Sequence, residues 1–308
     1  MTAQKILSPR AWGELFLLAL IWGGSFLSIR VGLEQLGVMT VVAFRILGAL
    51  LVLWGYVLAR GLPIPRSPRI WAAFLVLGLL NNVIPFSLIT WGELRIASGL
   101  ASILNAATAI FGVLVASLVF ADERLRLRKA VGVILGFAGV VTAIGLAALA
   151  EFDLASLSQL AILGAALSYA CAGAFARASM KGLKPQVVAA GMLAGSALVM
   201  GPVAVWQDGW PTFHYTPAVW AAVGYLAFAA TAGAYLLYYR VLGMAGAGNV
   251  SLVTLLVAPI AIVLGALVLG EALHPQAYAG FALLALGLMV IDGRVLRRLR
   301  PRPVQESA

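Results

Sequence analysis

The chain has 308 residues, of which 63% are hydrophobic and 10% are charged, and its formal net charge is +10. Soluble domains average about 45–50% apolar and about 25% charged residues, so this composition excludes a soluble protein. Apolar runs of roughly 20 residues fit spanning helices, whereas the short alternating segments of a β-barrel do not appear. The predicted fold class is an all-α integral membrane protein.

Apolar runs separated by charged or Pro- and Gly-rich breaks predict ten transmembrane helices. The expected ranges are 11–30, 38–59, 70–91, 97–120, 128–148, 157–177, 187–206, 217–239, 248–270 and 275–292. The first run follows two basic residues, as in a signal peptide, but no small-residue cleavage site follows it. We therefore expect it to remain as the first helix.

Basic residues are distributed unequally between the two sides of such a bundle. Eighteen of the 21 Lys and Arg residues fall in tails and loops on one side, and only Arg30 and Arg95 fall on the other. The positive-inside rule then places both termini in the cytoplasm of a multi-pass inner (plasma) membrane protein. The same distribution explains the net charge without nucleic acid as a partner.

The sequence repeats itself at a distance of 147 to 148 residues. The aligned pairs are Trp22/Tyr169, Arg30/Arg177, Glu123/Glu271, Gly132/Gly280 and Gly139/Gly287. This shift carries the first helix onto the sixth, so each repeat holds five helices and the two repeats enter the membrane from opposite sides. Inverted repeats are typical of transporters with a substrate site near the midplane. We expect repeats at 1–148 and 149–296, followed by a basic cytoplasmic tail at 297–308.

Three segments carry a family resemblance: "ALIWGGSF" (19–26), "FRILGALLVLW" (44–54) and "APIAIVLGALVLGEAL" (258–273). They resemble helices of the EamA-type members of the drug/metabolite transporter superfamily, among which ten-helix amino-acid exporters of the YddG kind are the most similar. The first-half counterpart of the third segment, "NAATAIFGVLV" (105–115), lacks the proline that the second half has at Pro259. We expect a kink there to be absent or supplied by glycine.

Polar side chains deep in the predicted helices indicate the transport pathway, because polar groups in lipid tend to face the bundle interior or a water-filled cavity. The candidate substrate-binding residues are Trp22, Ser25, Asn81, Asn82, Asn105, Thr108, Tyr169, Thr231, Tyr235 and Thr254. Each also has a structural alternative, since Ser and Thr often bond to their own helix backbone and aromatic residues often only pack. Tyr239, near a helix end, is expected in the interfacial belt.

Arg45, Glu123, Pro259 and Glu271 are candidates for gating or structural roles. An Arg at a helix centre costs about 2.5–3.5 kcal/mol to insert, so Arg45 predicts either a partner for a substrate carboxylate or an anchor between helices. The two Glu residues either bond to neighbouring helix ends or latch a gate. No acidic residue is predicted at mid-membrane, which favours a facilitated carrier over a proton-coupled pump.

These features predict a secondary transporter that exports small metabolites, most simply neutral or aromatic amino acids, by alternating access at a central cavity between the repeats. Multidrug or nucleotide-sugar transport stays open as the alternative. The sequence has no phosphate-binding loop, no catalytic acid or histidine cluster and a single cysteine, so we expect no enzyme activity, cofactor or metal. The expected partners are a small-molecule substrate and the lipid bilayer, with the chain as a monomer or weak dimer.

Overall fold

The computed structural model describes residues 9–121, 125, 127–144, 154–245 and 253–292, and these residues form ten helical rods. In chain order the rods are α1 (Pro9–Gly32); α2 (Val38–Ala59); α3 (Pro68–Gly78), η1 (Leu79–Val83) and α4 (Ile84–Gly92) in one rod; α5 (Ser98–Asn105) with α6 (Thr108–Val119); α7 (Leu127–Ile144); α9 (Leu154–Ser179); α10 (Pro185–Asp208); α11 (Pro217–Gly224), η2 (Tyr225–Gly233) and α12 (Ala234–Ala245) in one rod; α14 (Val253–Leu269); and α15 (Pro275–Asp292). Each rod begins within a few residues of its predicted start, or at the first described residue after it.

Local sequence explains where several rods begin and end. Pro68, Pro185 and Pro217 occupy the first turns of α3, α10 and α11, where the missing backbone N–H costs nothing. Gly209 and Gly270 end α10 and α14 with φ angles of 83° and 64°, a region that side chains with a Cβ rarely adopt. Proline residues at the starts and glycine residues at the ends therefore fix the boundaries of these rods.

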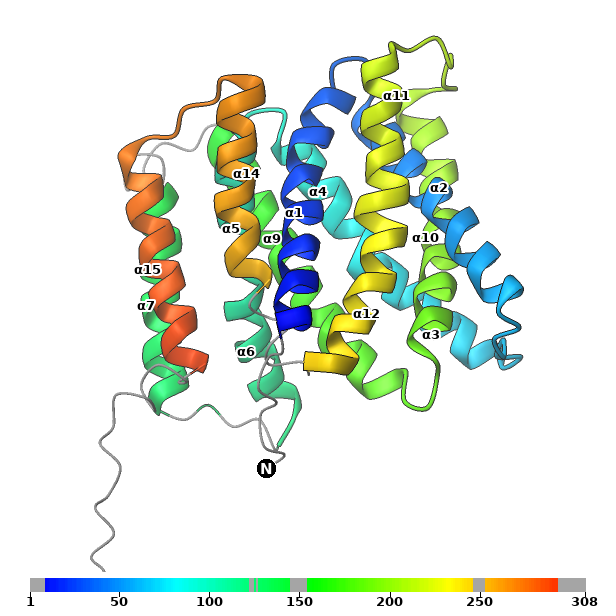
Figure 1. The fold of residues 1–308 in the computed structure, drawn as a ribbon, viewed down its shortest axis with the longest axis horizontal. Coiled ribbons are helices and arrows are strands. Elements are labelled where there is room, and N and C mark those ends of the chain that lie inside the picture. The colour runs from blue at the N-terminus through cyan, green and yellow to red at the C-terminus, as the bar shows by residue number, and fades with distance from the viewer. Residues whose placement is uncertain (1–8, 122–124, 126, 145–153, 246–252, 293–308) are drawn as a thin grey trace, which may run out of the picture.

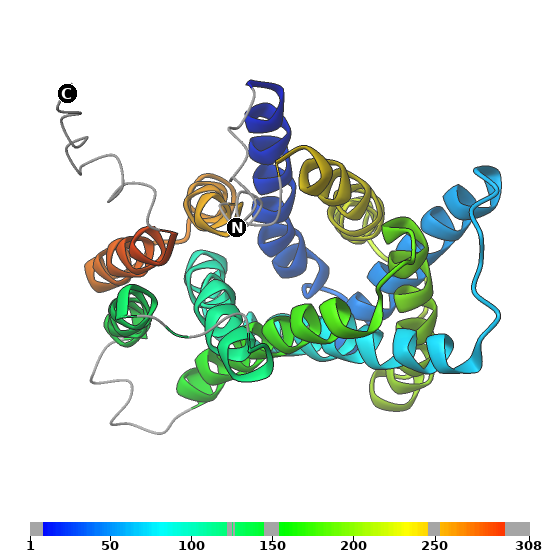
Figure 2. The same ribbon diagram turned by 90° about the horizontal axis from the view of Figure 1, so that it is seen from below.

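Seven helical segments among the described residues are long and apolar enough to cross a membrane, and two shorter apolar helices accompany them. The seven segments are Pro9–Gly32, Val38–Ala59, Pro68–Gly92, Ser98–Val119, Leu157–Ser179, Pro185–Asp208 and Pro217–Met244. The rods cross the bundle at different tilts, with α2 and the α3–α4 rod inclined to the upright α7 and α15, which lie together at one edge (Figure 1). Seen along the rods, the other eight surround a central region (Figure 2).

The helix packing has the symmetry of the sequence repeat. The rod α1 packs on α14 and α12, while its repeat counterpart α9 packs on α6 and α4, which are the counterparts of α14 and α12. The pairs α2 with α10 and α7 with α15 are their own counterparts. Exchanging the two halves of the chain therefore reproduces the contacts, which confirms the predicted fold of two inverted five-helix repeats.

Two π-helical segments occur at equivalent places in the two halves. The segment η1 lies in the middle of the third rod and η2 lies in the middle of the eighth. The repeat shift of 147 residues carries 79–83 onto 226–230, inside η2. Short π-helical turns are rare and frequently mark functional sites, so the repeat preserves an unusual backbone feature as well as sequence.

The fourth rod is interrupted where no proline or glycine stands, and this break was not predicted. At Phe111 and Gly112, which the repeat shift aligns with Pro259, α6 continues without a break, as expected of a segment that lacks the proline. The break falls at Ala106 and Ala107, between α5 and α6. There the backbone N–H of Ala107 donates to the carbonyl of Leu104 at 3.1 Å, a tighter turn than the α-helical one. In the second half, α14 continues through Pro259 as one helix.

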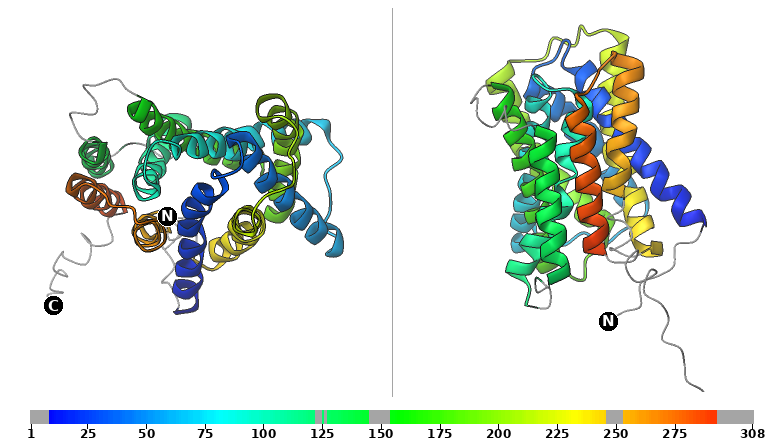
Figure 3. Two further views of the ribbon diagram at one scale, coloured as in Figure 1. Left: turned by 90° about the horizontal axis from the view of Figure 1, so that it is seen from above. Right: turned by 90° about the vertical axis from the view of Figure 1, so that its left-hand side faces the viewer.

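The pair α7 and α15 meets backbone to backbone along a row of glycines (Figure 3). A Cβ on Gly139 would lie 2.5 Å from the backbone nitrogen of Leu284, and one on Gly287 would lie 2.6 Å from the carbonyl oxygen of Gly132. Small residues let transmembrane helices approach this closely, and close packing replaces the hydrophobic effect that lipid does not supply.

We therefore expect Gly139→Ala to lower the free energy of unfolding by about 1–3 kcal/mol, because the added methyl group forces the two backbones apart. Gly112→Ala in α6 is the matched control, since a Cβ there meets nothing within 4 Å. Thermal unfolding of the purified protein in detergent measures both. Equal transition temperatures for the two variants would contradict the close helix contact.

Candidate functional site

A cavity of about 530 Å³ lies in the centre of the bundle, with walls from both halves of the chain. Eight of the ten candidate substrate residues line it: Trp22, Ser25, Asn81, Asn105, Thr108, Tyr169, Tyr235 and Thr254. Arg45 also lines it. Asn82 and Thr231 do not reach the cavity and lie buried behind its wall, with exposed fractions of 0% and 1%. The structure thus gathers side chains from helices far apart in sequence around one space.

The two ends of the cavity differ. We call the end of the bundle that carries residues 33–37, 93–97, 209–216 and 270–274 the distal end, and the end that carries 60–67 and 180–184 the proximal end. Lining residues toward the distal end are buried, among them Ile29, Ile89 and Ser102. Toward the proximal end, Gly173 is exposed and Leu242 is partly exposed. The cavity is therefore closed distally and more accessible proximally.

Arg45 is the one basic side chain on the cavity wall among the described residues. It is 7% exposed, its Nε donates to Thr231 Oγ1 at 2.8 Å, and its guanidinium carbon lies 3.7 Å from the centre of the Phe86 ring. No carboxylate of the described residues lies within ion-pairing distance of it. The side chain is thus held in place by a hydroxyl and an aromatic face, while its positive charge is not neutralised by an anion.

The Thr231 hydroxyl that binds Arg45 is held in position by the π-helix η2, to which Thr231 belongs. Thr231 Oγ1 donates to the carbonyl of Leu226, five residues earlier, at 2.8 Å. A second carbonyl of η2, on Ala230, accepts from Trp22 Nε1 at 3.2 Å. In the other half, the carbonyl of Leu80 in η1 accepts from Ser168 of α9 at 2.7 Å. Side chains of the first helix of each half therefore bond to carbonyls in the π-helix of the other half.

A polar network joins η1 to α12 and α10. The hydroxyl of Tyr235 donates to Asn82 Oδ1 at 2.7 Å and accepts from Asn81 Nδ2 at 3.0 Å. Asn82 Nδ2 donates to Ser196 Oγ of α10 at 2.9 Å. Asn82 is thus fully occupied in tying three rods together, whereas Asn81 and Tyr235 also reach the cavity.

Aromatic side chains supply much of the proximal wall. Tyr238 lies 6.0 Å from Trp22 and 5.4 Å from Tyr239, measured between ring centroids, and all three line the cavity. Tyr238 was not among the residues predicted from the sequence, and Tyr239 was predicted in the interfacial belt, whereas both line the cavity. The signal was present, because Tyr235, Tyr238 and Tyr239 follow the i, i+3, i+4 spacing of one helix face.

Asn105 ends α5 at the break in the fourth rod, on the cavity wall. Its backbone carbonyl accepts from Thr108 Oγ1 at 2.7 Å, but its side-chain Oδ1 is buried with no hydrogen-bond partner among the described residues. Nearly all buried polar atoms in proteins are paired, so this buried, unpaired acceptor on a residue of the cavity wall is a group that the described residues leave unsatisfied.

The four gating or structural candidates have separate positions. Glu271 caps the start of α5, where its two oxygens accept from Ser98 N at 3.1 Å and from Ser98 Oγ at 2.6 Å. Pro259 lies inside α14. Glu123, the repeat counterpart of Glu271, lies outside the described residues. Glu271 therefore joins the segment after α14 to the fourth rod at the distal end.

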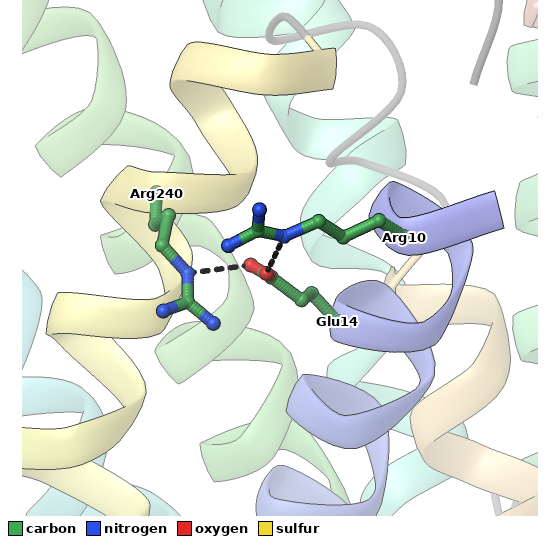
Figure 4. Close-up of polar contacts among 3 residues, drawn as sticks. All are labelled: Arg10, Glu14 and Arg240. Atoms are coloured by element: carbon green, nitrogen blue, oxygen red, sulfur yellow. Dashed lines mark hydrogen bonds and ion pairs between the residues drawn. The ribbon is translucent and has the colours of Figure 1, made fainter. Parts of the chain in front are cut away.

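An ion-pair group lies at the proximal end, between α1 and α12 (Figure 4). Glu14 accepts from Arg240 Nε at 2.7 Å and from Arg10 Nε at 3.1 Å. The Glu14 side chain is only 10% exposed, whereas the two arginines are largely exposed. This group holds the start of the first rod against the end of the eighth.

Comparison with known proteins gives relatives along nearly the whole chain. A "Probable terminal-alkyne amino-acid exporter" of Streptantibioticus cattleyicolor is 28% identical over 96% of this chain and 97% of its own. A "Probable amino-acid metabolite efflux pump" of Salmonella typhimurium is 26% identical over 89% and 92%. An "Uncharacterized transporter" of Archaeoglobus fulgidus is 24% identical over 92% and 98%.

A crystal structure with 20% sequence identity superposes with a TM-score of 0.67 over 96% of this chain and 100% of that one, which shows a shared fold. The family model for the EamA-like transporter family matches twice, at residues 11–145 and 156–292. With the ten rods, the repeat-related packing and the central cavity, these matches show that the chain is a multi-pass membrane transporter of the EamA-like transporter family.

Proposed function

We propose that this transporter exports α-amino acids, or closely similar zwitterionic metabolites, through the central cavity. The observation that carries the proposal is the unneutralised guanidinium of Arg45 in an otherwise neutral, aromatic space. Burying an unpaired cation is costly, and the cost is offset when a ligand brings an anion. A carboxylate also matches the planar fork of a guanidinium in geometry.

The other end of the ligand has a candidate partner in Asn105. Asn105 lines the same cavity, and its buried, unpaired Oδ1 would accept a hydrogen bond from an ammonium group once the side chain turns toward the ligand. Trp22, Tyr169 and Tyr238 offer flat apolar surface for a side chain. One donor site, one acceptor site and an aromatic wall together fit a neutral or aromatic amino acid.

The basic residues support an orientation of the chain in the membrane. With the proximal loops rich in Lys and Arg, we propose that this end and both termini are cytoplasmic and that the distal end faces outward. The cavity, closed distally and accessible proximally, would then be ready to load substrate from the cytoplasm. Movement between the repeats 1–148 and 149–296 would open the distal end.

Removing the charge of Arg45 should impair transport of amino acids selectively. We expect Arg45→Gln to lower affinity about 10- to 100-fold, because a hydrogen bond to a charged group contributes about 1.5–3 kcal/mol. Counterflow in proteoliposomes measures this, with Arg95→Gln as control, since Arg95 is exposed at the distal end.

A second experiment changes the ligand and compares exchange of an amino acid with exchange of the corresponding amine. Wild type should exchange an amino acid and discriminate against the amine made by removing its carboxylate, and Arg45→Gln should lose that discrimination. Equal exchange of the amine by wild type would overturn the role of Arg45. Exchange of apolar cations or nucleotide sugars alone, from a wider panel, would overturn the amino-acid assignment in favour of those substrates.

The Asn105 site is tested with Asn105→Leu. We expect a loss of affinity of about tenfold for a free amino acid, because a charged donor loses its acceptor. The N-acetylated amino acid, which has no ammonium group, should be bound equally by the variant and by wild type. Thr142→Val is the control, since that exposed hydroxyl donates to the carbonyl of Ala138 in its own helix. If Asn105→Leu lowered the affinity for both ligands by the same factor, the substitution would be acting on the whole cavity, and the ammonium site would be contradicted.

A further inference from the structure

Glu93 is a fully buried carboxyl group that holds nothing in place. It follows the last residue of α4 at the distal end, and its exposed fraction is 0%. Neither Oε1 nor Oε2 has a hydrogen-bond partner among the described residues. Only its backbone is engaged, since its N–H donates to the carbonyl of Ile89 at 2.9 Å and its carbonyl accepts from Arg30 Nη1.

The position of Glu93 connects it to the transport pathway. Ile89 lines the distal part of the cavity, and Glu93 comes four residues later, one helical turn farther toward the distal end on the same face. Ile29 and Ile89 belong to one apolar cluster with Leu36 and Ile96, which lie in the distal turns. Glu93 therefore lies in the layer that closes the cavity distally, and opening that layer would admit water to it.

The surroundings of the carboxyl disfavour its charged form. The charged groups that act on it are Arg30 of α1, Arg45 of α2 and Glu271 after α14. From α9, the backbone of Ser158 and the side chain of Ile162 pack against Gly92, next to Glu93. Burial raises the pKa of Glu93 well above its usual range, and the nearby charge of Arg30 only partly opposes this.

Other unpaired atoms mark the same junction of α4 and α9. Ser158 Oγ and Gln159 Oε1 are also buried without a partner among the described residues. Because buried polar groups are normally satisfied, such a group of unpaired atoms points to a function beyond packing. The two α9 side chains are uncharged, so they add no counter-ion for an ionised Glu93.

We propose that Glu93 is a proton-binding site that controls the distal end of the pathway. Its carboxyl carries a proton while the end is closed, and it releases that proton to the distal medium when the end opens and water reaches it. Identifying the distal side as the outside rests on the proposed function, but the proton site itself does not. A proton-coupled pump would be expected to have an acid at mid-membrane, and the sequence has none there. Glu93 lies elsewhere, in the layer that closes the cavity distally.

The sign of the pH effect follows from linkage. Protonation is favoured in the closed conformation, so its stabilisation is complete below the ordinary carboxyl pKa and is lost as the pH rises from there to the raised pKa. Between the ordinary and the raised pKa, each pH unit changes the closed-to-open ratio by up to about tenfold. Acid on the distal side therefore slows opening, and alkali favours it.

Infrared spectroscopy of the reconstituted protein tests the site without any substrate. Near neutral pH, wild type should show the carbonyl stretch of a protonated carboxyl group, and Glu93→Gln should lack it. Glu34→Gln is the matched control, since Glu34 is an exposed acid in a neighbouring distal turn and should leave the band intact. A wild-type spectrum without the band would overturn the proposal, whatever the substrate is.

Transport supplies the second readout. Counterflow by wild type should rise several-fold as the distal medium is changed from acid to alkaline, with the proximal pH fixed. Glu93→Gln, which mimics the protonated form, should be slow and independent of distal pH, while Glu93→Asp and Glu34→Gln should keep the response. An unchanged pH profile in Glu93→Gln, or a response that follows sodium in place of protons, would overturn the proposal.

Discussion

Every backbone polar group that enters lipid needs a partner within the protein, and this constraint organises the whole bundle. Unbroken helices satisfy it without help, so most of the chain is straight apolar rods. The two π-helical segments do not, because widening the helix disturbs its regular bonding. Trp22 and Ser168 supply donors to carbonyls there, each from the first helix of the opposite half. Polar side chains deep in the bundle thus satisfy backbone carbonyls of the π-helical segments, whether or not they also contact a substrate.

The same bonds explain how an arginine is kept in the middle of a membrane protein. The π-helix η2 presents Thr231 to Arg45, and Phe86 covers the guanidinium. The cost of burying the charge is therefore reduced by fixed protein groups, and no carboxylate of the described residues pairs with the guanidinium. The hydroxyl, the ring and the guanidinium come from three different rods, so under the proposed function the site would be preorganised for a carboxylate.

The rods and the inverted repeat were predictable because hydrophobic runs and internal similarity are properties of the chain itself, and eight of the ten substrate candidates lie on the cavity wall. The sequence did not predict which neighbouring residue turns inward. Asn82 was grouped with Asn81, yet the π-helix turns Asn82 toward Ser196 and away from the cavity. The break at Ala106 was missed because nothing in its residue types disfavours a helix. Glu93 was missed because an acid next to a predicted loop suggests solvent, and only tertiary packing buries it.

The glycine row between α7 and α15 has a mechanical consequence. The two backbones touch only where glycines stand, so a shift along the helix axis would bring side chains against the opposing backbone. The contact therefore holds α7 and α15 in one register. Because the two helices come from opposite halves and lie at one edge of the bundle, movement between the halves would turn about this edge more readily than slide along it.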